Sequence, residues 1–216
     1  MLQLHYHPTD ASLMPHIFLE ELGVPFELVL VDRSRNAQQS PEYLRLNPNG
    51  KIPVLVDGDL VLYETPAILL HLADTHPDKQ WMPALGTPLR AHAYKWMVWL
   101  SNTLHPNMTN YFYAERYVPA ENVADFVART EARIGPLLDQ LEAQLQSSGG
   151  PWLLGETYTP ADCMALVLCS WTRNLQRPAS SLPALGAYID RMRQRPAVQR
   201  ASATERLPET FFKKAG

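Results

Sequence analysis

The run NPNGKIPVL at residues 47–55 contains a turn and the strand around which the first half of the chain is built. Gly50 and Pro53 mark the turn, and the apolar residues that follow predict a strand over 52–56. A proline at the head of a strand removes one hydrogen-bond donor from the ladder, which is typical of a sheet edge. Because few X–Pro bonds are cis, the sequence alone favours a trans bond between Ile52 and Pro53.

Strands and helices are predicted on both sides of this run. Asp57-Gly58 lies between two apolar stretches and predicts a hairpin. The predicted elements are, in order, a strand at 2–6, a helix at 12–22 stopped by Gly23, a strand at 26–31, strands at 52–56 and 60–63, and a helix opened by Thr65-Pro66. This β-α-β, β-β-α order predicts a small sheet with one parallel and one antiparallel pair.

The remainder of the chain reads as helical. Helical patterns cover roughly 88–113, 120–147, 160–175 and 183–194. Three prolines and a glycine within 75–86 indicate a linker. We therefore predict an α/β domain at 1–76, a linker at 77–86 and an all-helical domain at 87–216.

Composition excludes several classes of protein. The net charge is −3, and no basic block is longer than Lys213-Lys214, so nothing indicates nucleic-acid binding. No apolar stretch reaches the 18 residues of a membrane span, and the first 22 residues lack a signal peptide's pattern. The two cysteines, Cys163 and Cys169, predict buried thiols in a reducing compartment. The cytoplasm is the expected location, and no residue cluster suggests a metal.

Two helix starts carry residues suited to chemistry. Ser12 opens the first helix, where free N–H groups and the helix dipole favour a thiolate that a hydroxyl can also bond. Glu64 and Thr65 open a later helix, where they could hold the ammonium and carboxylate of an amino acid. Taken alone, each pattern favours an ordinary helix cap.

The order of three motifs resembles the N-terminal domain of cytosolic glutathione transferases, with the bacterial beta-like branch most similar. The motifs are Tyr6…Ser12…Pro15-His16, the run 47–55, and Tyr63 to Ile68. Thr159-Pro160-Ala161-Asp162 resembles the family's capping box, so the resemblance covers essentially the whole chain. It implies a thioredoxin-like fold for the first domain and an all-α second domain.

The resemblance also implies roles for individual residues. Pro53 is expected to be cis, Ile52 to pair with the cysteinyl backbone of glutathione beside Lys51, and Glu64 and Thr65 to hold the γ-glutamyl end. Ser12 is expected to activate the sulfur, with Tyr6 as the alternative hydroxyl. Beta-class members typically carry a cysteine where this chain has Ala11, so disulfide chemistry is in doubt.

A second group of residues is expected to bind the acceptor substrate. By resemblance, His105, Tyr111 and Trp171 face a cleft between the domains, although aromatic residues of this kind are commonly core. The expected activity is conjugation of glutathione, as co-substrate, to a hydrophobic electrophile by a homodimer. The alternatives are a non-enzymatic binding or regulatory protein of the same fold, and a glutathione-dependent isomerase or dehalogenase.

Overall fold

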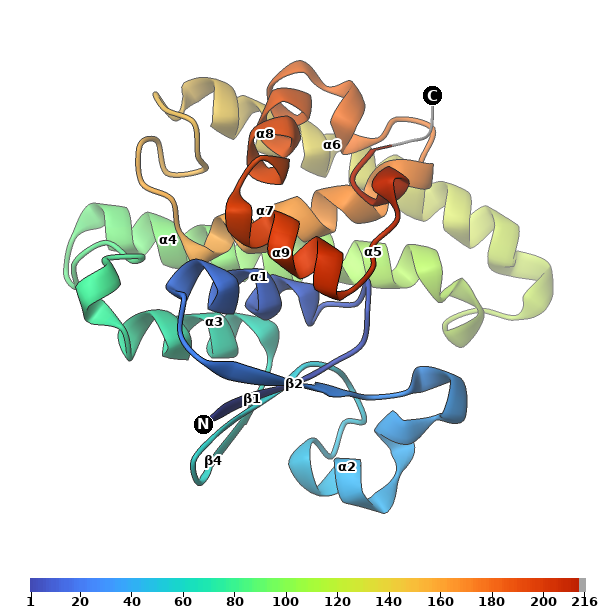
Figure 1. Cartoon of the computed structure of the whole chain (residues 1–216). Coiled ribbons are helices and arrows are strands. Elements are labelled where there is room, and N and C mark those ends of the chain that lie inside the picture. Colours follow the sequence, from blue (N-terminus) through green and yellow to red (C-terminus); the bar gives the residue numbers. More distant parts are fainter. Residues whose placement is uncertain (214–216) are drawn as a thin grey trace. The chain divides into compact units, whose positions relative to one another are not determined.

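The computed structural model describes residues 1–213, which divide into two compact units. The first unit comprises residues 1–81 and 194–208, and the second comprises 82–193 and 209–213. Figure 1 shows the chain coloured along its sequence. Within residues 1–213, no helix is both long and apolar enough to cross a membrane.

The first unit is built on a four-stranded mixed sheet of order β2-β1-β3-β4. The strands are β1 (Leu2–Tyr6), β2 (Phe26–Leu30), β3 (Val54–Asp57) and β4 (Leu60–Tyr63). β1 and β2 are parallel, whereas β1–β3 and β3–β4 are antiparallel. The predicted mixed sheet is confirmed. The hairpin loop is Gly58-Asp59, one residue later than predicted, because Asp57 pairs with Leu60.

Helices cover both faces of this sheet. On one face α1 (Leu13–Leu22) packs against α3 (Thr65–Asp74), over buried sheet residues such as Leu4 and Leu55. On the other face α2 (Pro41–Leu46) places Tyr43 against Val31 and Val54. Side chains alternate between the faces along each strand, so adjacent residues serve two cores. The segment 32–49 was predicted as a connection, and six helical residues at 41–46 are too few to show a periodic pattern.

The last helix of the first unit comes from the far end of the chain. The sequence prediction placed residues 194–208 in the helical domain, but α9 (Pro196–Thr204) packs against α1. It buries small apolar residues there, and ion pairs Arg195–Glu21 and Arg200–Glu20 join it to the end of α1. A contact between segments about 180 residues apart leaves no local pattern in the sequence.

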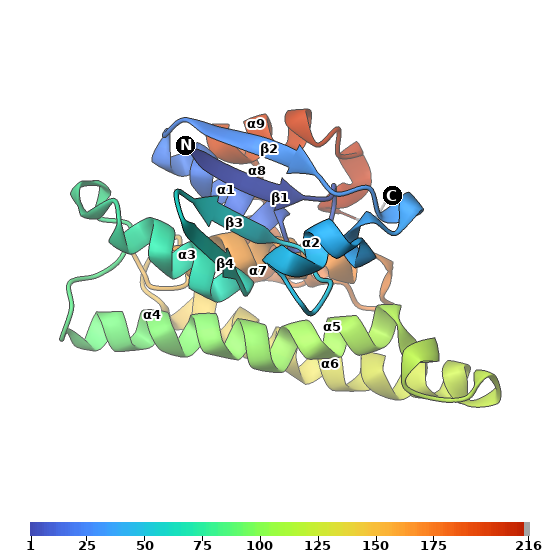
Figure 2. The same ribbon diagram turned by 90° about the horizontal axis from the view of Figure 1, so that it is seen from below.

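The second unit is helical, as predicted. Its helices are α4 (Pro88–Trp99), α5 (His105–Phe112), α6 (Val123–Ser147), α7 (Pro160–Trp171) and α8 (Pro183–Arg193). α7 is its centre, because every residue from Pro160 to Ser170 is buried. A π-helical segment at 100–104 joins α4 to α5, so they run on as one long rod beside α6 (Figure 2). Pro106 lacks the N–H that would bond the Asn102 carbonyl there.

Two predicted features of α7 are confirmed. Asp162 accepts a hydrogen bond from the Thr159 N–H at 2.8 Å, as expected for the capping box. Tyr158 and Cys163 flank this cap, with the hydroxyl 3.1 Å from the sulfur. Cys163 and Cys169 are both buried, and neither forms a disulfide. Burial raises the pKa of Cys169 to about 12.

Candidate functional site

The strand register brings three segments to one end of the sheet. His5 pairs with Val54, and Val54 pairs with Tyr63. The antiparallel directions then place the residues after β1, those before β3 and those after β4 at the same end. These are the loop 7–12, the turn 50–53 and the start of α3. The three motifs that are separate in the sequence are therefore neighbours in the first unit.

The turn before β3 leaves one residue's backbone unpaired. The Ile52–Pro53 bond is cis, as the resemblance implied. Within residues 1–213, neither the N–H nor the carbonyl of Ile52 has a hydrogen-bond partner. Ile52 is half-buried, and Lys51 beside it is exposed. An extended peptide could pair with Ile52 as an added strand does.

The start of α3 differs by one residue from the prediction. Glu64, not Thr65, is the N-cap: its carbonyl accepts the first helical bond from Ile68, and its backbone has φ 72° and ψ 110°. Thr65 and Pro66 are the first two helical residues. The Glu64 side chain is exposed, whereas Thr65 is buried. The Thr65 N–H is among the helix-start donors that lack an intrahelical partner, a suitable place for a carboxylate.

The Ser12 hydroxyl faces back into its own loop. Ser12 is fully buried, and its Oγ donates to the His7 carbonyl at 3.0 Å while accepting from the His7 N–H at 3.1 Å. A serine hydroxyl has one proton, so donation to a bound sulfur would require the bond to His7 to break. The predicted catalytic role of Ser12 stays a prediction, and these contacts give the residue a structural role.

Two other contacts hold the same loop. Arg33, which follows β2, donates to both carboxylate oxygens of Asp10 at 2.8 and 2.9 Å. Burial raises the pKa of Asp10, and the Arg33 guanidinium opposes that rise. Thr9 is exposed, adopts φ 70°, and donates its N–H to Glu205 at 3.1 Å. The loop is therefore fixed from β2, from α1 and from the residue after α9.

The sequence analysis missed the acidic partner of His16. His16 and Glu205 are both buried, and the carboxylate accepts from the imidazole Nδ1 at 2.7 Å. The ring of Tyr6 lies 6.3 Å from that of His16. Burial raises the pKa of Tyr6, and the nearby Glu205 charge adds to this. His16 appears in the first motif, but no local signal connects it with a residue 189 positions away.

The second unit brings together two of the three residues predicted for the acceptor. The His105 and Trp171 rings, from α5 and α7, are 5.3 Å apart and tilted at 54°. Tyr111 makes its ring contact with Phe112 instead. Burial raises the pKa of Tyr111, and Glu131 of α6 raises it further. A common cleft formed by all three residues stays a prediction.

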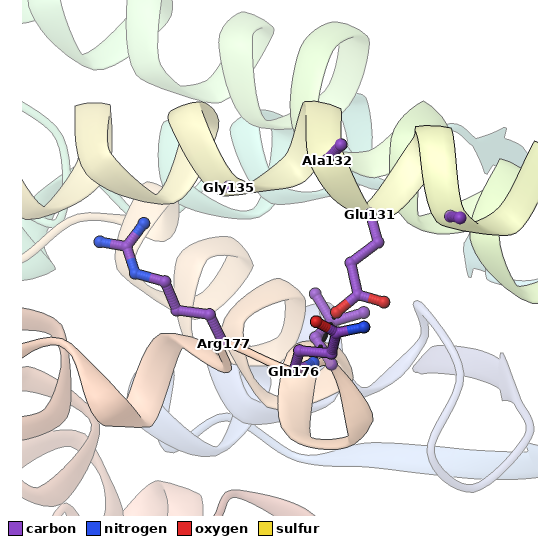
Figure 3. Close-up of a pocket in the computed structure, with 7 residues that line it drawn as sticks. Glu131, Ala132, Gly135, Gln176 and Arg177 are labelled. Carbon is purple, nitrogen blue, oxygen red and sulfur yellow. Dashed lines mark hydrogen bonds between the residues drawn. The ribbon is translucent and has the colours of Figure 1, made fainter.

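A cavity of about 230 Å³ lies elsewhere in the second unit (Figure 3). It is lined by Ala128, Glu131, Ala132, Gly135, Leu175, Gln176 and Arg177. The Glu131 carboxylate accepts the Gln176 N–H, which ties the segment after α7 to α6. None of the predicted site residues lines this cavity. The Glu131 carboxylate in its lining already accepts a hydrogen bond within the fold.

Family models match both halves of the chain. Residues 2–74 match the glutathione S-transferase N-terminal domain, and residues 94–204 match the C-terminal domain. Among curated relatives, glutathione S-transferase GST-4.5 of Xanthomonas campestris is 34% identical, over 95% of this chain and 100% of the relative. The disulfide-bond oxidoreductase YfcG of Escherichia coli is 31% identical, over 93% of this chain and 94% of the relative.

Solved structures agree with these matches. A Sulfitobacter glutathione transferase homologue with bound glutathione has a TM-score of 0.86 at 26% identity, over 94% of this chain and 98% of the other. A sphingomonad glutathione S-transferase complexed with glutathione has a TM-score of 0.82 at 32% identity, over 95% of this chain and 100% of the other. Matched in both halves and over nearly its whole length, this chain belongs to the glutathione S-transferase family.

Proposed function

We propose that this protein binds glutathione at the end of its sheet and transfers the glutathione sulfur to a hydrophobic electrophile. The observation that carries the proposal is the unpaired backbone of Ile52 at the sheet end that Glu64 and Thr65 share. Two similar proteins hold glutathione in their structures. No cofactor beyond glutathione enters the proposal.

Each part of the tripeptide has a matching group. The Ile52 N–H and carbonyl pair with the cysteinyl backbone, next to Pro53 and Lys51. The Thr65 N–H at the start of α3 receives the γ-glutamyl carboxylate. The exposed Glu64 carboxylate receives the ammonium group. With the tripeptide bound in this way, we expect the sulfur to lie toward the loop 7–12 and the start of α1.

The sulfur is held as a thiolate by the first turn of α1 and a hydroxyl of this loop. The N-terminal dipole of α1 favours the anion, and a hydrogen bond to the charged form lowers the thiol pKa. Ser12 is fully buried and its proton goes to the His7 carbonyl, whereas Thr9 is exposed, where bound glutathione can reach it. We therefore assign the donor to Thr9 and loop positioning to Ser12.

A pair of variants separates these two hydroxyls. Thr9→Val removes the Thr9 hydroxyl at nearly constant volume, and we expect kcat to fall about 10- to 150-fold, the range for losing a hydrogen bond to a charged group. The pH–rate profile should move to higher pH, because the thiol pKa rises. If Ser12→Ala shows that shift and Thr9→Val does not, the donor is Ser12 as the sequence first indicated.

The acceptor is proposed to bind in the second unit. His105 and Trp171 form its aromatic surface, and Tyr111 lies further along α5. In the reaction, the thiolate forms a bond to the electrophilic carbon of an aromatic halide, and the halide leaves. An electrophile panel would show whether conjugation, isomerisation or dehalogenation is fastest.

A homodimer and a cytoplasmic location complete the proposal. Exposed apolar side chains on α4 and β4 support an interface between copies: Leu60, Val61, Tyr94 and Val98. Buried thiols at Cys163 and Cys169, neither of them in a disulfide, suit a reducing compartment. Light scattering should give about twice the 24.4 kDa chain mass, and the monomer mass at micromolar concentration would contradict the dimer.

The decisive test of function has two steps. Retention on immobilised glutathione reports binding, and conjugation of an aromatic halide reports transfer. We expect both. Retention without any turnover over an electrophile panel would favour a binding or regulatory role, and no retention would contradict the proposal.

A further inference from the structure

The carbonyl oxygen of Lys51 accepts two hydrogen bonds from one short segment. Tyr43 Oη and Asn47 Nδ2 each donate to it at 2.8 Å. Tyr43 lies in α2 and Asn47 is the residue that ends this helix. The carbonyl before Ile52 is therefore held by α2, a helix that carries none of the glutathione-binding residues proposed above.

This contact controls the direction of the next N–H group. The Lys51 carbonyl and the Ile52 N–H belong to one peptide unit, which is planar and, because the cis bond comes one residue later, trans. In such a unit the two groups point in opposite directions. Holding the Lys51 carbonyl against α2 therefore aims the Ile52 N–H away from α2.

Tyr43 is suited to this task at neutral pH. It is 5% exposed and packs with Val31 and Val54, while its ring meets that of His5 edge to face at 6.0 Å. Burial raises the pKa of Tyr43 well above its usual range, so the hydroxyl keeps its proton and remains a donor. The packing fixes the ring, and the ring fixes the hydroxyl.

We propose that Tyr43 is a positioning residue for glutathione, which acts by holding the Lys51 carbonyl so that the Ile52 backbone is set to pair with the cysteinyl group. The inference rests on the proposed function. It assigns part of the binding to a buried residue that the tripeptide does not touch. Preorganisation of this kind affects binding more than the chemical step.

Tyr43→Phe is the sharpest test, because it removes one hydroxyl and leaves the packed ring. We expect the Kd and KM for glutathione to rise about threefold to tenfold, as for loss of one hydrogen bond. The kcat at saturating glutathione should stay within about twofold of the wild-type value. The pH–rate profile should keep its wild-type position. Titration calorimetry with glutathione and steady-state kinetics give these values.

Tyr188→Phe is the matched control. Tyr188 is also buried, and its hydroxyl shares its proton between the Asp162 backbone oxygen and carboxylate, both 3.1 Å away, in the second unit. The Tyr188→Phe variant should have a lower melting temperature than wild type and an unchanged KM for glutathione. An equal rise in KM in both variants would mean that general destabilisation, not positioning, is responsible, and would overturn the inference.

A second variant covers the case in which Tyr43→Phe does not fold. Asn47→Asp keeps an acceptor for the Asn49 N–H, which Asn47 now binds at 3.0 Å, and removes the donor to Lys51. Asn47→Asp should also raise the Kd for glutathione, as Tyr43→Phe is expected to do. If wild type binds glutathione and neither variant binds it less tightly, only this inference fails. If wild type binds none, the proposed function fails first.

Discussion

Ser12 and His7 are joined by two hydrogen bonds that close a ring between a side chain and a backbone. The Ser12 hydroxyl donates to the His7 carbonyl at 3.0 Å and accepts from the His7 N–H at 3.1 Å. Ser12 directly precedes α1 and His7 directly follows β1. The ring therefore ties the start of the first helix to the end of the first strand, across the loop that the glutathione sulfur would approach.

Ser12→Ala should affect the stability of the fold more than it affects the rate of the chemical step. It leaves the N–H and carbonyl of the half-buried His7 without their partner, which costs about 1–3 kcal/mol. We expect a clearly lower melting temperature with a pH–rate profile that keeps its wild-type position. Calorimetric unfolding and the pH dependence of kcat would check this. A variant of unchanged stability would show that the ring contributes little.

Glu205 should matter to stability although it comes at the far end of the chain. Its carboxylate accepts hydrogen bonds from the buried His16 imidazole and from the Thr9 N–H. Glu205→Ala leaves the buried His16 Nδ1 without its hydrogen-bond partner, and a buried polar group left unsatisfied costs about 1–3 kcal/mol. Glu205→Gln retains one side-chain oxygen and should lose less. Denaturant unfolding of the two variants measures the difference, and equal stability of wild type and Glu205→Ala would refute the role.

Much of the fold follows from local sequence patterns. The β-α-β unit, the hairpin and the Asp162 cap were predicted because each is signalled by residues within a few positions. The contacts of α9 with α1 and of Glu205 with His16 were not, since nothing in a single sequence links distant segments. The same limit applied to the Ser12 hydroxyl. The sequence places it at a helix start, but only the packed loop shows that it faces His7.

The candidate site was predicted to a similar extent. The cis bond before Pro53 was implied by resemblance rather than by residue preferences. Tyr43 was missed, because its function depends on a hydrogen bond to a backbone oxygen and not on a motif. The sequence favours Thr65 as the cap of α3, since threonine is a preferred cap residue, and the positive φ of Glu64, the actual cap, leaves no signal in the sequence.

Glu64 should contribute to binding while costing stability. Its carboxylate is proposed to hold the ammonium group of glutathione, so Glu64→Gln should weaken binding by about 1–3 kcal/mol. Its φ of 72° lies where glycine is favoured, so Glu64→Gly should be more stable than Glu64→Gln while binding no better. Calorimetry of binding and unfolding separates the two effects. Wild-type affinity in Glu64→Gln would contradict the placement.

Asp162 should give the helical unit an unusual dependence on pH. Burial raises the pKa of Asp162 from 3.8 to about 6, although its hydrogen bonds oppose the rise. Between these values the folded chain holds a proton that the unfolded chain has released. The stabilising contribution of this group is therefore full below pH 4 and falls as pH rises to about 6, by about 3 kcal/mol.

Asp162→Asn provides the reference for this effect, because an amide does not titrate in this range. The stability of wild type relative to Asp162→Asn should decrease as pH rises from about 4 to about 6. Denaturant unfolding at a series of pH values gives the two curves. A stability difference that grows with rising pH would mean that Asp162 is ionised in the folded chain throughout.

The pKa of the thiol of bound glutathione tests the central claim most directly. Ultraviolet absorbance of the thiolate, followed in the wild-type complex as pH is raised, measures that pKa without an acceptor substrate. We predict a value at least about one unit below the ordinary thiol pKa of about 8.5, because the α1 dipole and a loop hydroxyl both favour the anion. Bound glutathione that titrates like the free tripeptide would contradict the account.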